Sequence, residues 1–78
     1  MKNEIEDLLN KLGTQVDGVE SYLRRLHKIG ERPEFYNDEN LKKLGQVLRV
    51  RTDLAMDTGV DHLREDILQI EEILRGTF

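Results

Sequence analysis

The side chains of this chain that could do chemistry are two histidines, one serine and many carboxylates. His27 and His62 are far apart in the sequence, and neither belongs to a Glu-x-x-His or His-x-x-x-His pair, the spacings that place two metal ligands on one helix face. His62 does have Glu65 and Asp66 within helical reach and Asp61 beside it, an arrangement compatible with a weak metal site. These acids lie opposite the apolar stripe of their predicted helix, so we interpret them as a solvated face and predict no metal site.

A nucleophile and a phosphate-binding loop are not indicated either. Ser21 lies between Glu20 and Tyr22 in a predicted helix, without the glycine elbow that exposes a catalytic serine. The six glycines are scattered and form no phosphate-binding pattern. The chain has no cysteine, which excludes thiolate nucleophiles, thiolate metal ligands and disulfides. We therefore predict that the protein is not an enzyme and that it has no catalytic residue and no cofactor.

The sequence indicates a binding surface more clearly than a catalytic site, because basic residues gather in the middle of the chain. Residues 24–51 contain eight basic and four acidic residues, whereas the segments on either side are net acidic. If the helices flanking Pro33 fold back as a hairpin, these cations and an aromatic pair form a basic tip that suits RNA phosphate or an acidic protein surface. The predicted binding residues are Arg24, Arg25, Lys28, Arg32, Phe35, Tyr36, Lys42 and Lys43. The alternative interpretation is that these charges only solvate the helix ends and complement a helix C-terminus.

Length and composition describe a small single domain over residues 1–78. A domain of this size hides roughly 60 % of the surface that its unfolded chain exposes, so its core is thin. With 37% hydrophobic and 36% charged residues, the chain is too polar for a membrane protein and too apolar for a disordered one. The opening MKNEIEDLLNKLG mixes acids into its apolar residues, unlike a signal peptide. We expect a cytoplasmic protein with no membrane partner, whose thin core favours self-association or docking.

Apolar residues in the first third of the chain recur with the spacing of a helix that packs along one narrow seam. Steps of four and three residues alternate, as in a coiled coil. The seam consists of Ile5, Leu9, Leu12, Val16, Val19, Leu23 and Leu26. We predict one helix over about residues 3–29, with the seam buried in the core or against a second copy. Gly13 and Gly18 weaken this helix by about 1 kcal/mol each, and Gly30 should occupy the left-handed position after it.

Pro33 marks a corner in the chain. It disfavours helix at Arg32, so the chain should leave the first helix in an extended conformation. Asn37 should then cap a second helix over about residues 38–57.

The apolar stripe of this second helix falls out of phase near Thr52 with the stripe that follows. One long helix with a kink and a break at Gly59 both fit the pattern, and we favour the break. A third helix over about residues 61–75, capped by Asp61, would follow.

The segment Asp53 to Val60 resembles the middle of a helix-turn-helix of phage repressor type, with Ala55 four residues before Gly59. The helix after it would enter the major groove of DNA, yet this helix is rich in acids that repel phosphate. These acids are Asp61, Glu65, Asp66, Glu71 and Glu72. We do not expect DNA as a partner.

Pro33-Glu34-Phe35-Tyr36-Asn37-Asp38, followed by Leu41-Lys42-Lys43-Leu44-Gly45, resembles part of the amino-terminal helical domain of bacterial peptide chain release factors. The preceding Tyr22-Leu23-Arg24-Arg25-Leu26 is compatible with the likeness, which covers roughly residues 19–54. The Gly-Gly-Gln motif that serves peptide release in that family is absent, so the resemblance implies at most a ribosome-facing or factor-mimicking module.

Taken together, these patterns predict an all-α fold, an antiparallel helical hairpin or three-helix bundle that dimerises through the seam. The leading functional hypothesis is a non-enzymatic regulatory or adaptor protein that acts by helix-mediated protein-protein interaction and self-association. One alternative is an RNA- or ribosome-binding module that uses the basic tip. Another is a phage or plasmid inhibitor of a host enzyme.

Overall fold

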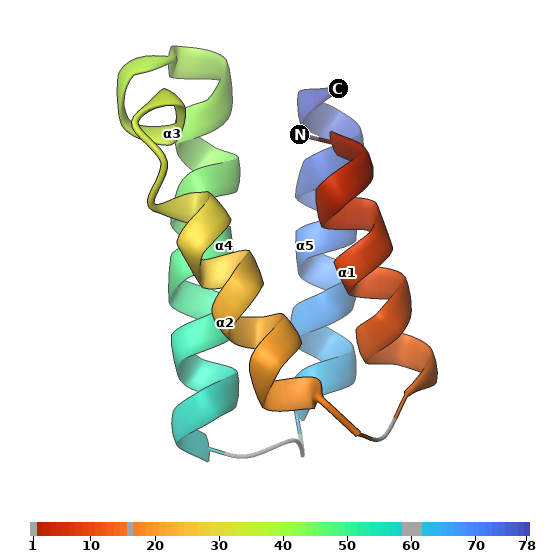
Figure 1. Cartoon of the computed structure of the whole chain (residues 1–78). Coiled ribbons are helices and arrows are strands. Elements are labelled where there is room, and N and C mark those ends of the chain that lie inside the picture. The colour runs from red at the N-terminus through yellow and green to blue at the C-terminus, as the bar shows by residue number, and fades with distance from the viewer. Residues whose placement is uncertain (1, 16, 59–61) are drawn as a thin grey trace.

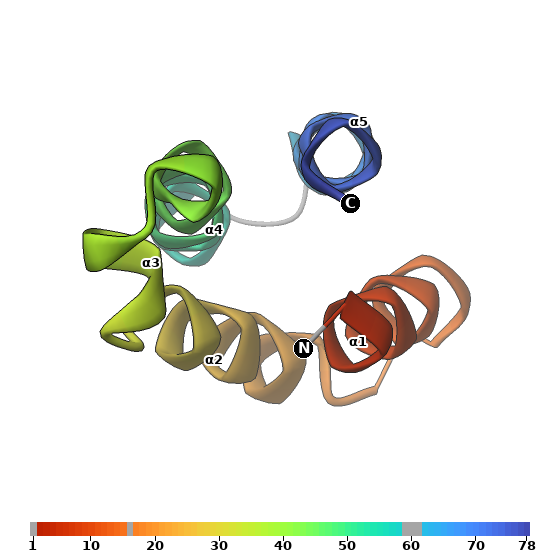
Figure 2. The ribbon, with the colours of Figure 1, turned by 90° about the horizontal axis from the view of Figure 1, so that it is seen from above.

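Four long helices form the body of the protein. The computed structural model describes residues 2–15, 17–58 and 62–78, and these residues form helices and no strand. The helices are α1 (Lys2–Thr14), α2 (Val19–Gly30), the short α3 (Glu34–Asn37), α4 (Glu39–Thr58) and α5 (Leu63–Thr77). The four long helices run alternately down and up (Figure 1) and stand at the corners of a square when seen from above (Figure 2). The all-α prediction is confirmed, with a four-helix antiparallel bundle in place of the hairpin or three-helix arrangement.

The helix predicted over residues 3–29 is two helices. It breaks between Thr14 and Val19, because Gly18 adopts the left-handed conformation at φ 82°. Among the described residues Gly18 alone has a positive φ, which glycine adopts at no steric cost. The hydroxyl of Tyr22 donates a hydrogen bond of 2.6 Å to Oε1 of Gln15, across the turn. The chain therefore reverses here, and α1 packs against α2 and α5.

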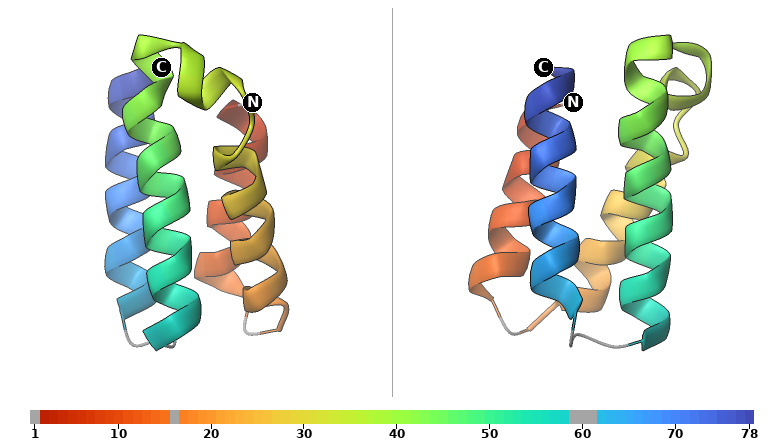
Figure 3. Two further views of the ribbon diagram at one scale, coloured as in Figure 1. Left: turned by 90° about the vertical axis from the view of Figure 1, so that its left-hand side faces the viewer. Right: turned by 180° about the vertical axis from the view of Figure 1, so that it is seen from behind.

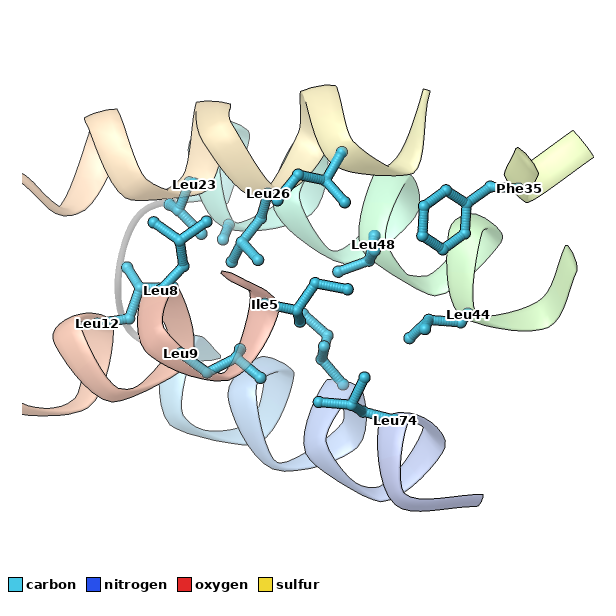
Figure 4. Close-up of a cluster of buried hydrophobic side chains, with 13 residues drawn as sticks. Ile5, Leu8, Leu9, Leu12, Leu23, Leu26, Phe35, Leu44, Leu48 and Leu74 are labelled. Atoms are coloured by element: carbon cyan, nitrogen blue, oxygen red, sulfur yellow. The ribbon is translucent and has the colours of Figure 1, made fainter. Parts of the chain in front are cut away.

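This reversal buries the apolar seam inside a single chain. Figure 4 shows side chains from α1 and α2 pointing toward side chains of α4 and α5. The fully or almost fully buried seam residues are Ile5, Leu9, Leu12, Leu23 and Leu26. Val19 is half-buried, and Val16 lies outside the described residues. The described buried members of the seam therefore lie in the core of a single chain, and these side chains are not available to a second copy in this fold.

Arg32 lies outside α2 and α3, as predicted, but Pro33 itself has helical and not extended backbone angles. Pro33 has φ −53° and ψ −33° and precedes α3, where its missing backbone N–H is not needed by the helix. α3 bridges the upper ends of α2 and α4 (Figure 3). The cap of α4 is also one residue later than predicted: the carboxylate of Asp38 accepts a 2.8 Å hydrogen bond from the backbone N–H of Asn40, so Asp38 and not Asn37 caps the helix.

Gly30 does not occupy a left-handed position, and its role is close packing. A Cβ on Gly30 would lie 3.0 Å from Cβ of Leu48 and 3.1 Å from the carbonyl oxygen of Gly45. A Cβ on Gly45 would lie 2.5 Å from Cβ of Phe35. Arg49 spans this contact, and its Nη1 donates a hydrogen bond to the carbonyl oxygen of Gly30. The two glycines therefore let the end of α2, the turn α3 and the start of α4 approach one another.

The break between the second and third predicted helices is present. α4 ends at Thr58 and α5 begins at Leu63. Residues 59–61, including the predicted cap Asp61, lie outside the described residues. α5 continues to Thr77, two residues beyond the predicted end, with Gly76 inside the helix.

Candidate functional site

The eight predicted binding residues do not form one site. Phe35 is fully buried beneath Gly45, so its assignment to a binding surface was wrong. Tyr36 is half exposed, and the guanidinium of Arg49 lies 4.3 Å from the centroid of its ring. Lys42 shares the shallow pocket beside Tyr36, whereas Lys43 lines a different pocket between α4 and α5. The predicted cations that share a surface are those of α2 and the residues just after it: Arg24, Arg25, Lys28 and Arg32.

The predicted basic tip also receives carboxylates from elsewhere in the chain. Both termini lie at the same end of the bundle as α3 (Figure 1), so the acidic start of α1 meets the end of α2. Nη2 of Arg32 lies 3.2 Å from Oε1 of Glu4, and Nζ of Lys42 lies 2.9 Å from Oε1 of Glu39. The turn at Gly18, which the single long helix of the prediction did not contain, brings Glu4 to Arg32, whereas Glu39 and Lys42 are close because they lie three residues apart in α4.

A groove of about 310 Å³ lies between α1 and α2; we call it the α1/α2 groove. The buried side chains of Leu8 and Ile29 contribute apolar atoms to its floor. Its charged lining residues are Glu4, Asp7 and Lys11 from the α1 side and Arg25, Lys28 and Arg32 from the α2 side. A second groove, of about 590 Å³, adjoins it. It is lined by Glu20, Ser21 and Arg24, and it shares Arg25 and Lys28 with the first groove. These two cations therefore stand on the ridge between the two grooves.

The cations around this ridge differ in whether they have a carboxylate partner. Lys11 pairs with Asp7 at 3.1 Å, and Arg24 pairs with Glu20 at 2.5 Å, both one helical turn apart. Arg32 pairs with Glu4, as described above. Arg25 and Lys28 are exposed, and within the described parts of the chain no carboxylate oxygen lies within 4.0 Å of either side-chain cationic group. The guanidinium carbon of Arg25 is 6.0 Å from the ring centroid of Tyr22, which is a distant contact. The surface thus carries two neighbouring cations whose charge is not neutralised by an ion pair.

A separate polar cluster joins α2 to α4 around His27. Nδ1 of His27 lies 3.0 Å from the hydroxyl of Thr52 and 3.4 Å from a carboxylate oxygen of Asp53, and Nε2 lies 2.7 Å from Oε1 of Glu31. Thr52 is fully buried and donates its hydroxyl hydrogen to the carbonyl oxygen of Leu48 at 2.6 Å. Sequence reasoning missed Thr52, although it stands four residues after Leu48 and three before Ala55, on the core side of the helix. The cluster provides hydrogen-bond partners for the buried hydroxyl of Thr52 at the contact between α2 and α4. We therefore interpret the cluster as structural.

Asp66 is the second buried polar residue that sequence reasoning missed. It was placed on a solvated face, but it is only 5% exposed and points toward α4, where Nη1 of Arg51 lies 3.4 Å from its carboxylate. Glu65 is exposed, with a carboxylate oxygen 3.8 Å from Nδ1 of His62. Within residues 2–15, 17–58 and 62–78, no three His, Asp or Glu side chains are placed to share a metal ion.

The fold and this surface define a small four-helix bundle with a partly basic groove along its first two helices. Comparisons of the chain with known protein families, with curated proteins and with solved structures found no match. Across the described residues, no helix combines the length and the apolar character needed to cross a bilayer.

Proposed function

We propose that this protein is a non-enzymatic adaptor that binds another protein through the α1/α2 groove. The observation that carries the proposal is the exposed pair Arg25 and Lys28, which has no ion-pair partner among the described residues while its cationic neighbours have one. Exposed charges that stay unneutralised attract groups of opposite sign and guide their approach. The ridge is therefore the part of this surface where carboxylates of a partner would form new ion pairs.

The lining of the groove favours a protein partner over RNA. Recognition of single-stranded RNA relies on aromatic side chains that stack on bases. Phe35 is buried and Tyr36 lies in a different pocket, so the cations of α2 have neither as a neighbour. Tyr22, whose ring centroid is 6.0 Å from the guanidinium carbon of Arg25, is half-buried and held by its hydrogen bond to Gln15. The carboxylates of Glu4, Asp7 and Glu20 also line the two grooves and pair with Arg32, Lys11 and Arg24, which leaves less positive charge for phosphate. A surface of mixed charge is better matched by another protein surface.

RNA or ribosome binding is the second candidate. Four cations on and just after one helix are the observation that favours it, together with the resemblance to release factors over residues 19–54. Binding to nucleic acid would weaken steeply with salt because it releases counterions, and each neutralised phosphate adds to that dependence. Self-association through the predicted seam is not part of the proposal, since the described buried members of that seam are in the core.

The test is a comparison of captured proteins between variants. The tagged protein, the double variant Arg25→Glu/Lys28→Glu and the control double variant Lys43→Glu/Arg64→Glu are each incubated with lysate of the source cells, once untreated and once after nuclease treatment. The control makes the same change in net charge at exposed positions on α4 and α5. We expect the same protein band with the unchanged chain and the control, and its loss with Arg25→Glu/Lys28→Glu.

Two outcomes would contradict the adaptor hypothesis. A band that survives equally in all three forms would show that the ridge is not the binding surface. A captured complex that disappears on nuclease treatment would favour the RNA alternative. Circular dichroism of each variant confirms that its helices are intact before the comparison is made.

A further inference from the structure

We infer that the α1/α2 groove binds a helix of a partner protein, and that the acidic side chains of this helix lie along one of its edges only. This inference rests on the proposed adaptor function and names the chemistry of its partner. It depends on the spacing of Arg25 and Lys28, on the apolar floor between α1 and α2, and on the carboxylates along the opposite edge of the groove.

The spacing of the two cations matches a helix. Arg25 and Lys28 are three residues apart in α2, which gives an axial separation of about 4.5 Å at 1.5 Å per residue. A partner helix presents side chains on one face at three- and four-residue intervals, so two of its carboxylates can meet these two cations. Same-face residues of an extended strand are about 6.6 Å apart, farther than the three-residue helical step of about 4.5 Å that matches the pair.

The floor of the groove sets the second requirement. Leu8 and Ile29 line it but are almost fully buried, with 5% and 2% exposure. An apolar side chain between the two carboxylates of the partner would rest on these residues, yet it would remove little apolar surface from water. Charge therefore dominates the contact, and we expect binding that forms quickly and weakens with salt.

The α1 edge of the groove sets the third requirement. Glu4 and Asp7 stand there, each already paired with a cation of this chain. A partner helix with acids all around would place a carboxylate against this edge, where the cations Lys11 and Arg32 are already paired and do not compensate it, and this cost selects against such a partner. A helix with its acids along one edge avoids this cost while its carboxylates meet Arg25 and Lys28.

The experiment compares two synthetic helical peptides of the same composition. In the first, glutamates repeat at three- and four-residue intervals along one edge beside a central leucine; in the second, the same glutamates are distributed around the helix. Binding of each labelled peptide to the full chain is measured by fluorescence anisotropy at low and moderate salt. We expect the one-sided peptide to bind about tenfold more tightly, and this binding to weaken about tenfold in Arg25→Glu/Lys28→Glu and to stay nearly unchanged in Lys43→Glu/Arg64→Glu.

A charge-swapped peptide, with lysine in place of each glutamate, tests whether the variant gains binding. It should bind Arg25→Glu/Lys28→Glu better than it binds the unchanged chain, which a loss of folding could not produce. Equal affinity for the two glutamate peptides, or no binding of the one-sided peptide, would overturn the inference. The adaptor function would still stand if the lysate experiment gave a band that depends on Arg25 and Lys28. A single-stranded RNA oligonucleotide that binds more tightly than the peptide would overturn both.

Discussion

Nδ1 of His27 lies 3.0 Å from the hydroxyl oxygen of Thr52, across the contact between α2 and α4. Thr52 uses its single hydroxyl hydrogen on the carbonyl oxygen of Leu48, at 2.6 Å. Its oxygen can therefore only accept from His27, and Nδ1 must be the donor. We expect the variants His27→Ala and Thr52→Val to be coupled in a double-mutant cycle by about 1 kcal/mol, measured by urea unfolding.

Thr58 provides the control for this cycle. It makes the same hydroxyl contact one helical turn back, to the carbonyl oxygen of Leu54 at 2.6 Å, but it is exposed. His27→Ala and Thr58→Val should therefore be additive. Additivity of His27→Ala with Thr52→Val as well would show that the hydrogen bond between His27 and Thr52 does not contribute to stability.

Replacing each of two glycines by alanine should change the free energy of unfolding in opposite directions. A Cβ on Gly45 meets Cβ of Phe35 at 2.5 Å, so Gly45→Ala should lower the free energy of unfolding by about 1 to 3 kcal/mol through overpacking. A Cβ on Gly13 meets nothing within 4 Å, so Gly13→Ala should stabilise α1 by roughly 0.5 kcal/mol. Chemical denaturation of both variants checks the pair. Destabilisation by Gly13→Ala would contradict the open space around that residue.

Gly18 should tolerate substitution poorly for a backbone reason. Its φ of 82° is left-handed, and an L-residue with a Cβ is disfavoured there by roughly 1 to 2 kcal/mol. A Cβ at this position would lie 3.4 Å from the Tyr22 ring, an ordinary van der Waals contact, so crowding adds little. We expect Gly18→Ala to lower the thermal midpoint, and Gly18→Asn to lower it less, since asparagine enters this region more readily. Equal losses for the two variants would point to crowding and not to φ.

Arg51 should matter more to stability than its surface position suggests. Its side chain is 34% exposed, but it is the cation that faces the buried carboxylate of Asp66. Arg51→Met should cost roughly 1 to 3 kcal/mol because it leaves that carboxylate poorly compensated. The exposed Arg64 is the control, and Arg64→Met should change the free energy of unfolding by less than about 0.5 kcal/mol. Adding Asp66→Asn to Arg51→Met should restore part of the loss, and no restoration would mean that packing of the Arg51 stem explains the effect.

The apolar spacing of the chain predicted helices and buried residues well, but it could not show where the chain turns back. From Leu12 to Val19 the chain reverses direction within seven residues, which is one heptad. The steps of four and three therefore continue across the turn with their phase unchanged, as they would in one continuous helix. The local signal for the turn was the pair Gly13 and Gly18, and of these Gly18 provides the left-handed residue.

The candidate site was only partly predictable for the same reason. Arg24, Arg25 and Lys28 were identified correctly as neighbours because they lie within one helical turn or so of each other. The ion pair of Arg32 with Glu4 joins residues 28 positions apart and exists only because α1 folds back. Phe35 and Tyr36 are adjacent and both aromatic, so composition could not tell which one is buried; the close approach at Gly45 decides it for Phe35.

The contact between α1 and α5 has a consequence for the order in which the bundle assembles. The other neighbouring pairs of long helices, α1 with α2, α2 with α4 and α4 with α5, are consecutive along the chain apart from the short α3, so their contacts close short loops. Contacts of low sequence separation form quickly, whereas the meeting of α1 with α5 closes a loop that spans almost the whole sequence and loses more chain entropy. We therefore expect a hairpin of two consecutive long helices to act as the folding nucleus, and the docking of α1 against α5 to complete the core late.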